Sequence, residues 1–261
     1  MRLARCFGAG MLLIAAAAAP ASAQQYQFGY KAFYSGLKIA EATARLHWTD
    51  GQYSLKIDAK SGGAVDWFVD IEHTTWSRGA LDTSPEHQSP GLQPKSHEYH
   101  SRDGKKRTSV ALAFTPWTAS IVKATPHPST ENRKPVPDGL KVGVFDPLSG
   151  ALALMRAATE QGECSGRVPV FDGRRRYDTV LENPQHEVRG GPRGKRPTLV
   201  CDFRFERIAG YRPKAKKWKG VKGKVWVQQL AEGLPMVPVR ITMDTRYGTG
   251  IIQMVSARPA N

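Results

Sequence analysis

Three histidines lie close together in the sequence, at His87, His97 and His100. Imidazoles bind zinc and other transition metals when two or three of them converge with a carboxylate. The segment 97–100 reads His-Glu-Tyr-His, which is one residue shorter than the helical zinc-protease spacing, and it is strand-like. Side chains three positions apart in a strand point to opposite faces. We therefore expect exposed strand histidines here and predict no metal site.

Nucleophilic catalysis has little support in the sequence. Residues 162–166 read Gly-Glu-Cys-Ser-Gly, which lacks the Gly-x-Ser-x-Gly spacing of a nucleophile elbow, and no strand leads into a helix there. Ser149 fits the first turn of a helix. We predict no catalytic residue and no cofactor.

Three carboxylates, Asp66, Asp70 and Glu72, surround the aromatic pair Trp67-Phe68. Such a group could bind or hydrolyse a glycan, but a glycosidase needs two carboxylates at a defined separation across a cleft. Asp66 and Asp70 fit a turn and a strand edge equally well. Hydrolysis of envelope glycans therefore remains an alternative, behind a function without catalysis.

Clusters of basic residues are the most distinctive surface feature of the sequence, and the last of them includes Tyr211 and Trp218. Lysine and arginine beside aromatic rings can bind phosphates, anionic lipid headgroups or glycans by charge, hydrogen bonding and stacking. The alternative is a solvated sheet surface that simply carries scattered cations. The candidates for anion binding are Lys105, Lys106, Arg107, Arg174, Arg175, Arg176, Arg193, Lys195, Arg196, Lys216 and Lys217.

The first 23 residues have the pattern of a secretory signal peptide. Two arginines precede an apolar run at 11–19, and cleavage is expected after Ala23 in Ala21-Ser22-Ala23. The run is shorter than the roughly 20 apolar residues that span a bilayer, so we do not expect a transmembrane protein. We predict one β-rich periplasmic domain over residues 24–261.

The chain is basic, with 38 Lys and Arg against 23 Asp and Glu and a formal net charge of +15. Because an exported protein does not meet nucleic acid, this charge favours anionic envelope material as a partner. Cys164 and Cys201 lie beyond the leader and, in an oxidising compartment, predict a disulfide. A cysteine nucleophile or metal ligand is the weaker alternative.

Alternation of apolar and polar residues predicts strands at 42–48, 53–60 and 239–244. Asp-Gly pairs at 50–51, 103–104 and 172–173 are typical of hairpin turns between successive antiparallel strands. Together these features predict a mostly β fold, a strongly curved antiparallel sheet or partial barrel. We expect two irregular loops, at 126–139 and 189–197, because both are rich in proline or glycine.

One helix is predicted at about 147–160, packed against the sheet as a plug or lid. Asp146 can cap its first turn, Pro147 suits the first helical position, and Gly162 ends it. Its apolar residues Leu148, Leu152 and Met155 fall on one face. Aromatic side chains are expected on inner strand faces, as core or as the lining of a lipid cavity; they are Trp48, Tyr53, Trp67, Phe68, Trp76, Phe114, Trp117 and Trp226.

Several segments, in order, resemble a family of Gram-negative envelope proteins known only as a domain of unknown function. They are Tyr30–Ala40, the start of the predicted helix at 146–149 with Arg156, Val168–Tyr177, Val225–Val227, Leu234-Pro235, Pro238–Ile241 and Gly248–Val255. The resemblance implies a mostly β periplasmic domain. It implies no substrate, cofactor or catalytic residue.

These observations lead to one functional hypothesis and its alternatives. We expect a non-enzymatic envelope protein that binds or handles an anionic or amphiphilic component, such as an anionic lipid or a glycan. A structural protein with a filled core and an envelope protein as partner is the alternative.

Overall fold

The computed structural model describes residues 24–260 except 64–69, 82–90, 214–219 and 246–247. The predicted signal peptide at 1–23 lies outside the described residues, as do Asp66, Trp67, Phe68, His87, Lys216, Lys217 and Trp218. Within the described part, one antiparallel sheet of thirteen strands carries a single α-helix, which confirms the mostly β prediction.

The strands run in chain order and are joined mainly by hairpins. They are β1 (Gln24–Tyr34), β2 (Leu37–Trp48), β3 (Gln52–Ser61), β4 (Ile71–Leu81), β5 (Leu92–Asp103), β6 (Lys106–Thr115), β7 (Thr118–Thr125), β8 (Gly166–Phe171), β9 (Arg176–Gly191), β10 (Gly194–Ala209), β11 (Lys222–Gln228), β12 (Val237–Thr245) and β13 (Gly248–Pro259). The helices are α1 (Pro147–Gln161) and the 3-10 turns η1 (Pro128–Thr130) and η2 (Asp138–Lys141).

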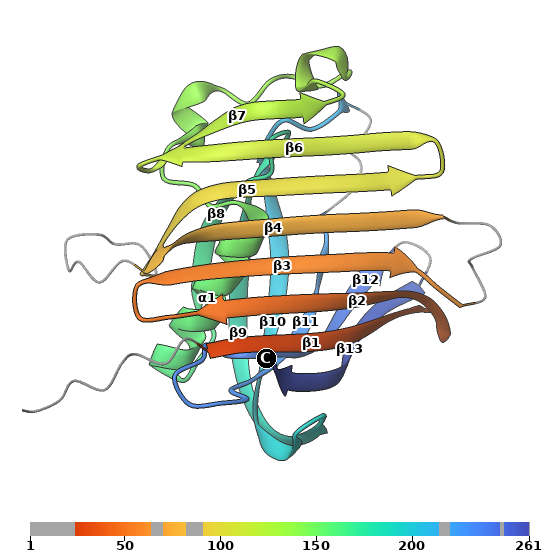
Figure 1. Cartoon of the computed structure of the whole chain (residues 1–261), viewed down its shortest axis with the longest axis vertical. Coiled ribbons are helices and arrows are strands. Elements are labelled where there is room, and N and C mark those ends of the chain that lie inside the picture. Colours follow the sequence, from red (N-terminus) through yellow and green to blue (C-terminus); the bar gives the residue numbers. More distant parts are fainter. Residues whose placement is uncertain (1–23, 64–69, 82–90, 214–219, 246–247, 261) are drawn as a thin grey trace, which may run out of the picture.

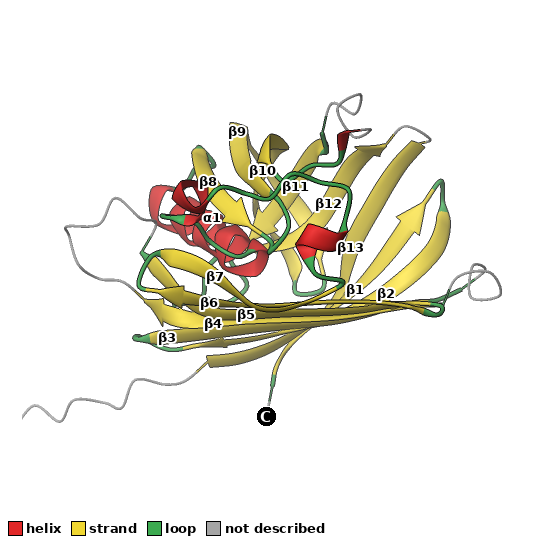
Figure 2. Ribbon diagram, turned by 90° about the horizontal axis from the view of Figure 1, so that it is seen from above, coloured by secondary structure: helices red, strands yellow, loops and turns green. Residues whose placement is uncertain are grey.

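The sheet consists of two meanders that meet at its middle. Its order runs from β7 through β1 to β13 and on to β8, so β1 pairs with β13 and every other pair is adjacent in sequence (Figure 1). Figure 2 shows the sheet bent into two layers, with β3–β7 in one, β8–β12 in the other and α1 lying at one side between them. This curvature creates the hollow in which the candidate site lies.

The two edges of the sheet, β7 and β8, are joined by the short segment 142–145. Val142 bridges Thr118 on β7, and Phe145 bridges Val170 on β8. The Phe145 N–H donates to the Pro169 carbonyl and the Phe171 N–H donates to the Phe145 carbonyl, both at 2.8 Å. The sheet is thereby nearly closed into a barrel, and the end of β8 at Pro169 and Phe171 is covered.

Helix α1 follows the expected local rules. The Asp146 carboxylate accepts the N–H groups of Leu148 and Ser149 at 3.0 Å, and Gly162 adopts the left-handed conformation that ends the helix. Just beyond it, Cys164 forms a disulfide with Cys201 on β10. The cross-link ties the end of α1 to the middle of the second layer.

The prediction of an irregular loop at 189–197 was wrong. Residues 189–197 form the end of the β9–β10 hairpin, where Arg189 pairs with Arg196 and Gly194 supplies the positive φ of the turn. The glycines and prolines there serve a tight turn and strand ends. The second predicted loop, at 126–139, is irregular apart from η1 and the start of η2, and it buries Pro128 and Val136.

Candidate functional site

An apolar cavity of about 280 Å³ lies between α1 and the inner face of the sheet. Its lining residues are Phe28, Tyr30, Ala42, Ala44, Leu46, Leu55, Ile57, Leu148, Ala151, Leu152, Met155, Met236, Val237, Pro238, Ile241 and Ile252. Leu148, Leu152 and Met155 are the helix face predicted from sequence. Only the hydroxyl of Tyr30 adds a polar side-chain group, and it donates to the Pro238 carbonyl at 3.0 Å. A molecule bound in the cavity would therefore contact almost only apolar side-chain groups.

Strand register explains why these residues face inward. On β2, Ala42, Ala44 and Leu46 alternate with residues of the outer face, and they pair with Ala59, Ile57 and Leu55 of β3. Small alanines on β2 leave space beneath the helix, whereas larger side chains at the same register would fill it. Burial raises the pKa of the Tyr30 phenol, so this residue stays neutral.

The aromatic residues expected in this lining lie elsewhere. Trp48 and Tyr53 are buried in the core with ring centroids 6.4 Å apart. Trp76 and Trp226 are on the outer face, where the Arg78 guanidinium lies 5.3 Å from the Trp76 ring centroid. For these two the inner-face prediction was wrong, because Ser77 and the valines on either side of Trp226 take the inward positions.

A second pocket, of about 510 Å³, is strongly basic. It is lined by Lys106, Thr108, Pro126, Glu131, Arg133, Arg174, Arg175, Tyr177, Phe205, Arg207, Tyr211, Arg212, Gly220 and Val221. These residues come from β6, β9, β10, the turn between β8 and β9, and the segments after β7 and β10. Six cations thus face a single lining carboxylate.

Glu131 is the centre of the ion pairs in the basic pocket. Its two oxygens lie 3.1 Å from Arg133 Nε, 2.9 Å from Arg174 Nε and 2.9 Å from Arg212 Nη2. Burial opposes ionisation of this carboxyl, but the three guanidinium groups prevail and hold the pKa of Glu131 below its ordinary value. The carboxylate therefore remains charged and fixes the arginines around it.

Sequence reasoning found only part of this pocket. Of the predicted anion-binding residues, Lys106, Arg174 and Arg175 line it. The others within the described chain lie outside the pocket lining: Lys105, Arg107, Arg176, Arg193, Lys195 and Arg196. The sequence analysis missed three lining residues, Glu131, Arg133 and Arg207. The only sequence signal for the first two was the tripeptide Glu-Asn-Arg at 131–133, inside the segment predicted to be an irregular loop.

A buried polar network joins α1 to the inner face of β4 and β5. Ser77 Oγ donates to Asp146 Oδ1 at 2.6 Å, and His97 Nδ1 lies 2.9 Å from Ser77 Oγ and 3.3 Å from Asp146 Oδ1. Burial would raise the pKa of Asp146, but hydrogen bonds from His97 and Ser149 lower it below the ordinary value. The prediction that His97 is exposed was therefore wrong, because α1 covers this part of the strand.

The network resembles a catalytic triad in residue types but differs in geometry. In a triad, serine and aspartate bind opposite nitrogens of the imidazole. Here Ser77 and Asp146 both contact Nδ1, and the exposed fractions of Ser77, His97 and Asp146 are 0%, 3% and 0%. Tyr53 donates its hydroxyl hydrogen to Ser149 Oγ at 2.8 Å and extends the network along the helix. The arrangement anchors α1 to the sheet.

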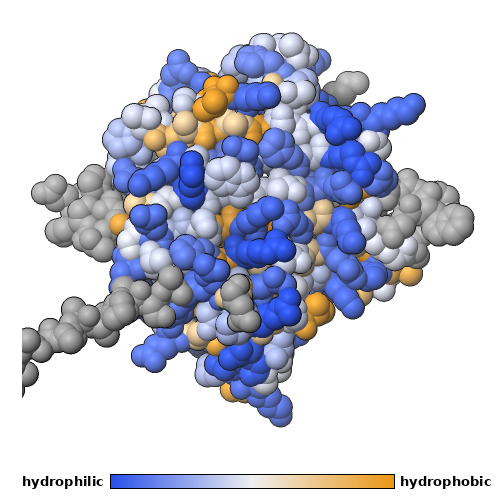
Figure 3. Space-filling view, in the orientation of Figure 1, coloured by the Kyte–Doolittle hydropathy of each residue, from blue (hydrophilic) through white to orange (hydrophobic). Residues whose placement is uncertain are grey.

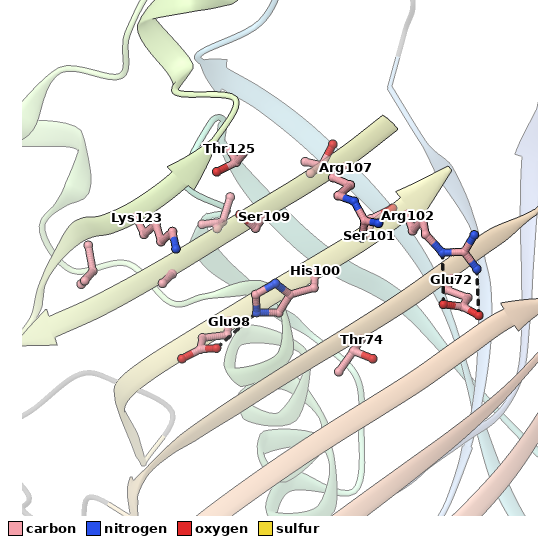
Figure 4. A pocket seen from close by; sticks show the side chains of 14 residues that line it. Glu72, Thr74, Glu98, His100, Ser101, Arg102, Arg107, Ser109, Lys123 and Thr125 are labelled. Atoms are coloured by element: carbon pink, nitrogen blue, oxygen red, sulfur yellow. Dashed lines mark hydrogen bonds and ion pairs between the residues drawn. The ribbon is translucent and has the colours of Figure 1, made fainter. Parts of the chain in front are cut away.

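A shallow groove of about 730 Å³ crosses the outer face of β4–β7 (Figure 4). His100 lies there, 3.3 Å from Glu98, and Arg102 pairs with both Asp70 and Glu72. Of the three carboxylates considered for glycan chemistry, Asp70 and Glu72 are thus paired with an arginine, and Asp66 lies outside the described residues. Figure 3 shows this side of the molecule, where hydrophilic residues predominate. Among the described residues, no group of three or more His, Cys, Asp and Glu could hold a metal ion.

No helix in the described part of the chain is long and apolar enough to cross a membrane.

No curated protein matches the sequence. Among solved structures, a β-barrel-like protein of the domain of unknown function DUF1849 from Brucella abortus is similar in fold. It is 10% identical, with a TM-score of 0.51 over 92% of this chain and 98% of that chain.

A "putative lipoprotein" from Parabacteroides distasonis is also 10% identical and covers 90% of this chain and 95% of its own, with a TM-score of 0.35. The model of one protein family matches residues 25–255 and therefore most of the sheet and both pockets. The chain therefore belongs to the family described as protein of unknown function DUF3108.

Proposed function

We propose that this protein is exported to the cell envelope and binds an amphiphilic envelope component, whose apolar chain occupies the cavity under α1. The observation that carries the proposal is the cavity of about 280 Å³ with an apolar lining. An engineered apolar cavity of about 150 Å³ stays dry and binds benzene, so this larger one can accept a segment of hydrocarbon chain.

The energetics favour a chain over a polar ligand. Each methylene group that leaves water for the cavity contributes about 0.8 kcal/mol. A polar group placed there would lose its hydrogen bonds to water without replacement, because the Tyr30 hydroxyl is already bonded to Pro238. The net charge of +15 supports an anionic headgroup on the same molecule.

The test combines native mass spectrometry with a binding titration. Mature protein purified gently from periplasm is expected to carry an adduct of lipid mass that organic extraction releases. In the titration, the extracted protein should bind a fluorescent fatty acid. The variant Ala42→Phe fills the cavity and should weaken this binding at least tenfold.

The matched control is Thr43→Phe, which places the same side chain on the opposite face of the same strand. It should bind like the wild type. A clean apo mass together with equal binding by Ala42→Phe and wild type would overturn the proposal. Thermal unfolding of both variants establishes that each is folded.

A further inference from the structure

The basic pocket is distinct from the cavity under α1, because the two linings share no residue. Its cations converge from four parts of the chain. Lys106 lies on β6, Arg133 follows β7, Arg174 lies in the turn between β8 and β9, and Arg212 follows β10. Basic side chains that are distant in the sequence thus face one hollow of about 510 Å³.

Three guanidinium groups in this pocket share one carboxylate. In the described part of the chain, Glu131 is the only carboxylate within ion-pair distance of Arg133, Arg174 or Arg212. The ammonium group of Lys106 adds a fourth positive charge to the lining, and it forms no ion pair with any described residue. The protein therefore leaves a net positive charge at this place, which suits an anion with more than one charge.

Two of these arginines are built into the pocket floor. The side chains of Arg133 and Arg174 are each only 10% exposed. Arg133 Nη1 donates to the Gly210 carbonyl at 2.9 Å, and Arg174 Nη2 donates to the Pro126 carbonyl at 2.7 Å. Because a guanidinium stays charged in proteins, burying two of them beside one carboxylate is unfavourable without further negative charge. A bound anion supplies that charge.

The backbone around Gly210 holds these donors in place. Gly210 has a φ of 82°, and a Cβ at this position would lie 2.1 Å from the Arg174 carbonyl oxygen and 2.9 Å from Val136 Cγ2. Only glycine therefore lets the segment after β10 approach the turn between β8 and β9 so closely. Donors that are already oriented lose less conformational entropy when a ligand binds.

Aromatic side chains form another part of the lining. The Tyr177 and Phe205 ring centroids are 5.3 Å apart, and Tyr211 lines the same pocket. Burial raises the pKa of both Tyr177 and Tyr211, so their phenols stay neutral and do not repel an anion. The rings offer apolar contact to the organic part of a ligand whose charged end meets the guanidinium groups.

We infer that the basic pocket binds a phosphate monoester group, at a site independent of the cavity under α1. A phosphate monoester carries close to two negative charges at neutral pH, and its three acceptor oxygens suit the paired N–H donors of arginine. A carboxylate has one charge and two oxygens, so it would leave more of the positive charge unneutralised. Soluble esters and lipid headgroups both present this chemistry, and the experiment separates them.

The first arm is isothermal titration calorimetry at low salt with two soluble probes. Glycerol 3-phosphate is compared with glycerate, a three-carbon polyol that carries a carboxylate instead of the phosphate ester. The wild type is expected to bind glycerol 3-phosphate at least tenfold tighter than glycerate. In Lys106→Gln/Arg212→Gln, the affinity for glycerol 3-phosphate should fall at least tenfold. Both altered side chains are exposed, and Glu131 keeps Arg133 and Arg174 as partners, so this variant should fold.

Two controls accompany this arm. Arg193→Gln/Lys195→Gln removes the same number of charges at the exposed turn of the β9–β10 hairpin, outside the pocket lining, and Ala42→Phe fills the other cavity. Both should bind glycerol 3-phosphate like the wild type. An equal loss in the hairpin variant would assign the effect to overall charge, and a loss in folded Ala42→Phe would show that the two sites are not independent. Either result overturns the inference.

The second arm uses vesicles to identify the source of the phosphate group. Wild type and Lys106→Gln/Arg212→Gln are sedimented with phosphatidylcholine vesicles that contain or lack phosphatidic acid. If the wild type does not bind glycerol 3-phosphate, sedimentation that requires phosphatidic acid and is lost in the variant assigns the site to a lipid headgroup. Binding of neither probe, or binding that the pocket variant keeps, overturns the inference. None of these outcomes depends on whether the cavity binds a hydrocarbon chain.

Discussion

Strands β4 and β5 place similar residues in opposite environments on their two faces. On the outer face, His100 lies beside Glu98 with side chains 58% and 39% exposed, and Arg102 pairs with neighbouring carboxylates. On the inner face, His97 lies beside Asp146 and Ser77 in a fully buried group. The presence of histidine, carboxylate and hydroxyl side chains therefore does not by itself show which of the two groups stabilises the fold.

The two groups differ in whether water can solvate a side chain that has lost its partner. A solvent-exposed ion pair is worth about 0–1 kcal/mol because water solvates either partner when the other is lost. A buried donor or acceptor left without its partner costs about 1–3 kcal/mol, because no water reaches it. The inner network should accordingly dominate the stability of this part of the molecule.

The largest effect is expected for Asp146→Ala. It removes the helix cap, worth about 1 kcal/mol, and leaves Ser77 and His97 without their acceptor, so the total loss should be about 3–5 kcal/mol. Urea unfolding at neutral pH measures it. Asp146→Asn keeps an acceptor oxygen and should lose less. A loss below about 1 kcal/mol in the alanine variant would remove the distinction between the two faces.

An intermediate effect is expected from His73, which lies on the inner face but is only partly buried. Burial lowers its pKa, and the Asp103 carboxylate opposes this only in part. A histidine with a lowered folded pKa stabilises the protein above its unfolded value of about 6.5, and this contribution is lost as the pH falls toward the folded value. Unfolding free energies between pH 7 and 5 should therefore fall less steeply in His73→Gln than in the wild type. Equal slopes would contradict the assignment.

The smallest effect is expected for Arg102→Ala on the outer face. Loss of its ion pairs with Asp70 and Glu72 should lower the free energy of unfolding only slightly, because water solvates the separated charges. Raising the salt to about 0.5 M should reduce the difference further. A salt-independent loss as large as that of Asp146→Ala would show that these pairs act like buried ones.

Local patterns were sufficient to predict much of the fold. The Asp-Gly turns at 50–51, 103–104 and 172–173 separate β2 from β3, β5 from β6 and β8 from β9. Asp146 and Gly162 delimit α1 because capping depends on residues within one helical turn. The disulfide followed from the count of the cysteines and from the oxidising compartment that the sequence predicts.

The candidate site was less accessible from sequence because its partners are far apart in the chain. Glu131 meets Arg174 and Arg212 only after the sheet curves and brings its two edge strands, β7 and β8, close together. His97 becomes buried only when α1 docks over β5. Such contacts depend on tertiary packing, which composition and periodicity do not encode locally.

The pairing of β1 with β13 sets the order in which this protein can be completed. Tyr26 pairs with Pro259, so the centre of the sheet forms only after the ribosome has made the final strand. Until then β1 and β12 each expose an unsatisfied backbone edge, which can recruit strands of other chains. Because the central contact is so distant in sequence, loop closure makes it slow. Loss of the last strand would therefore open the sheet at its centre, between β1 and β12.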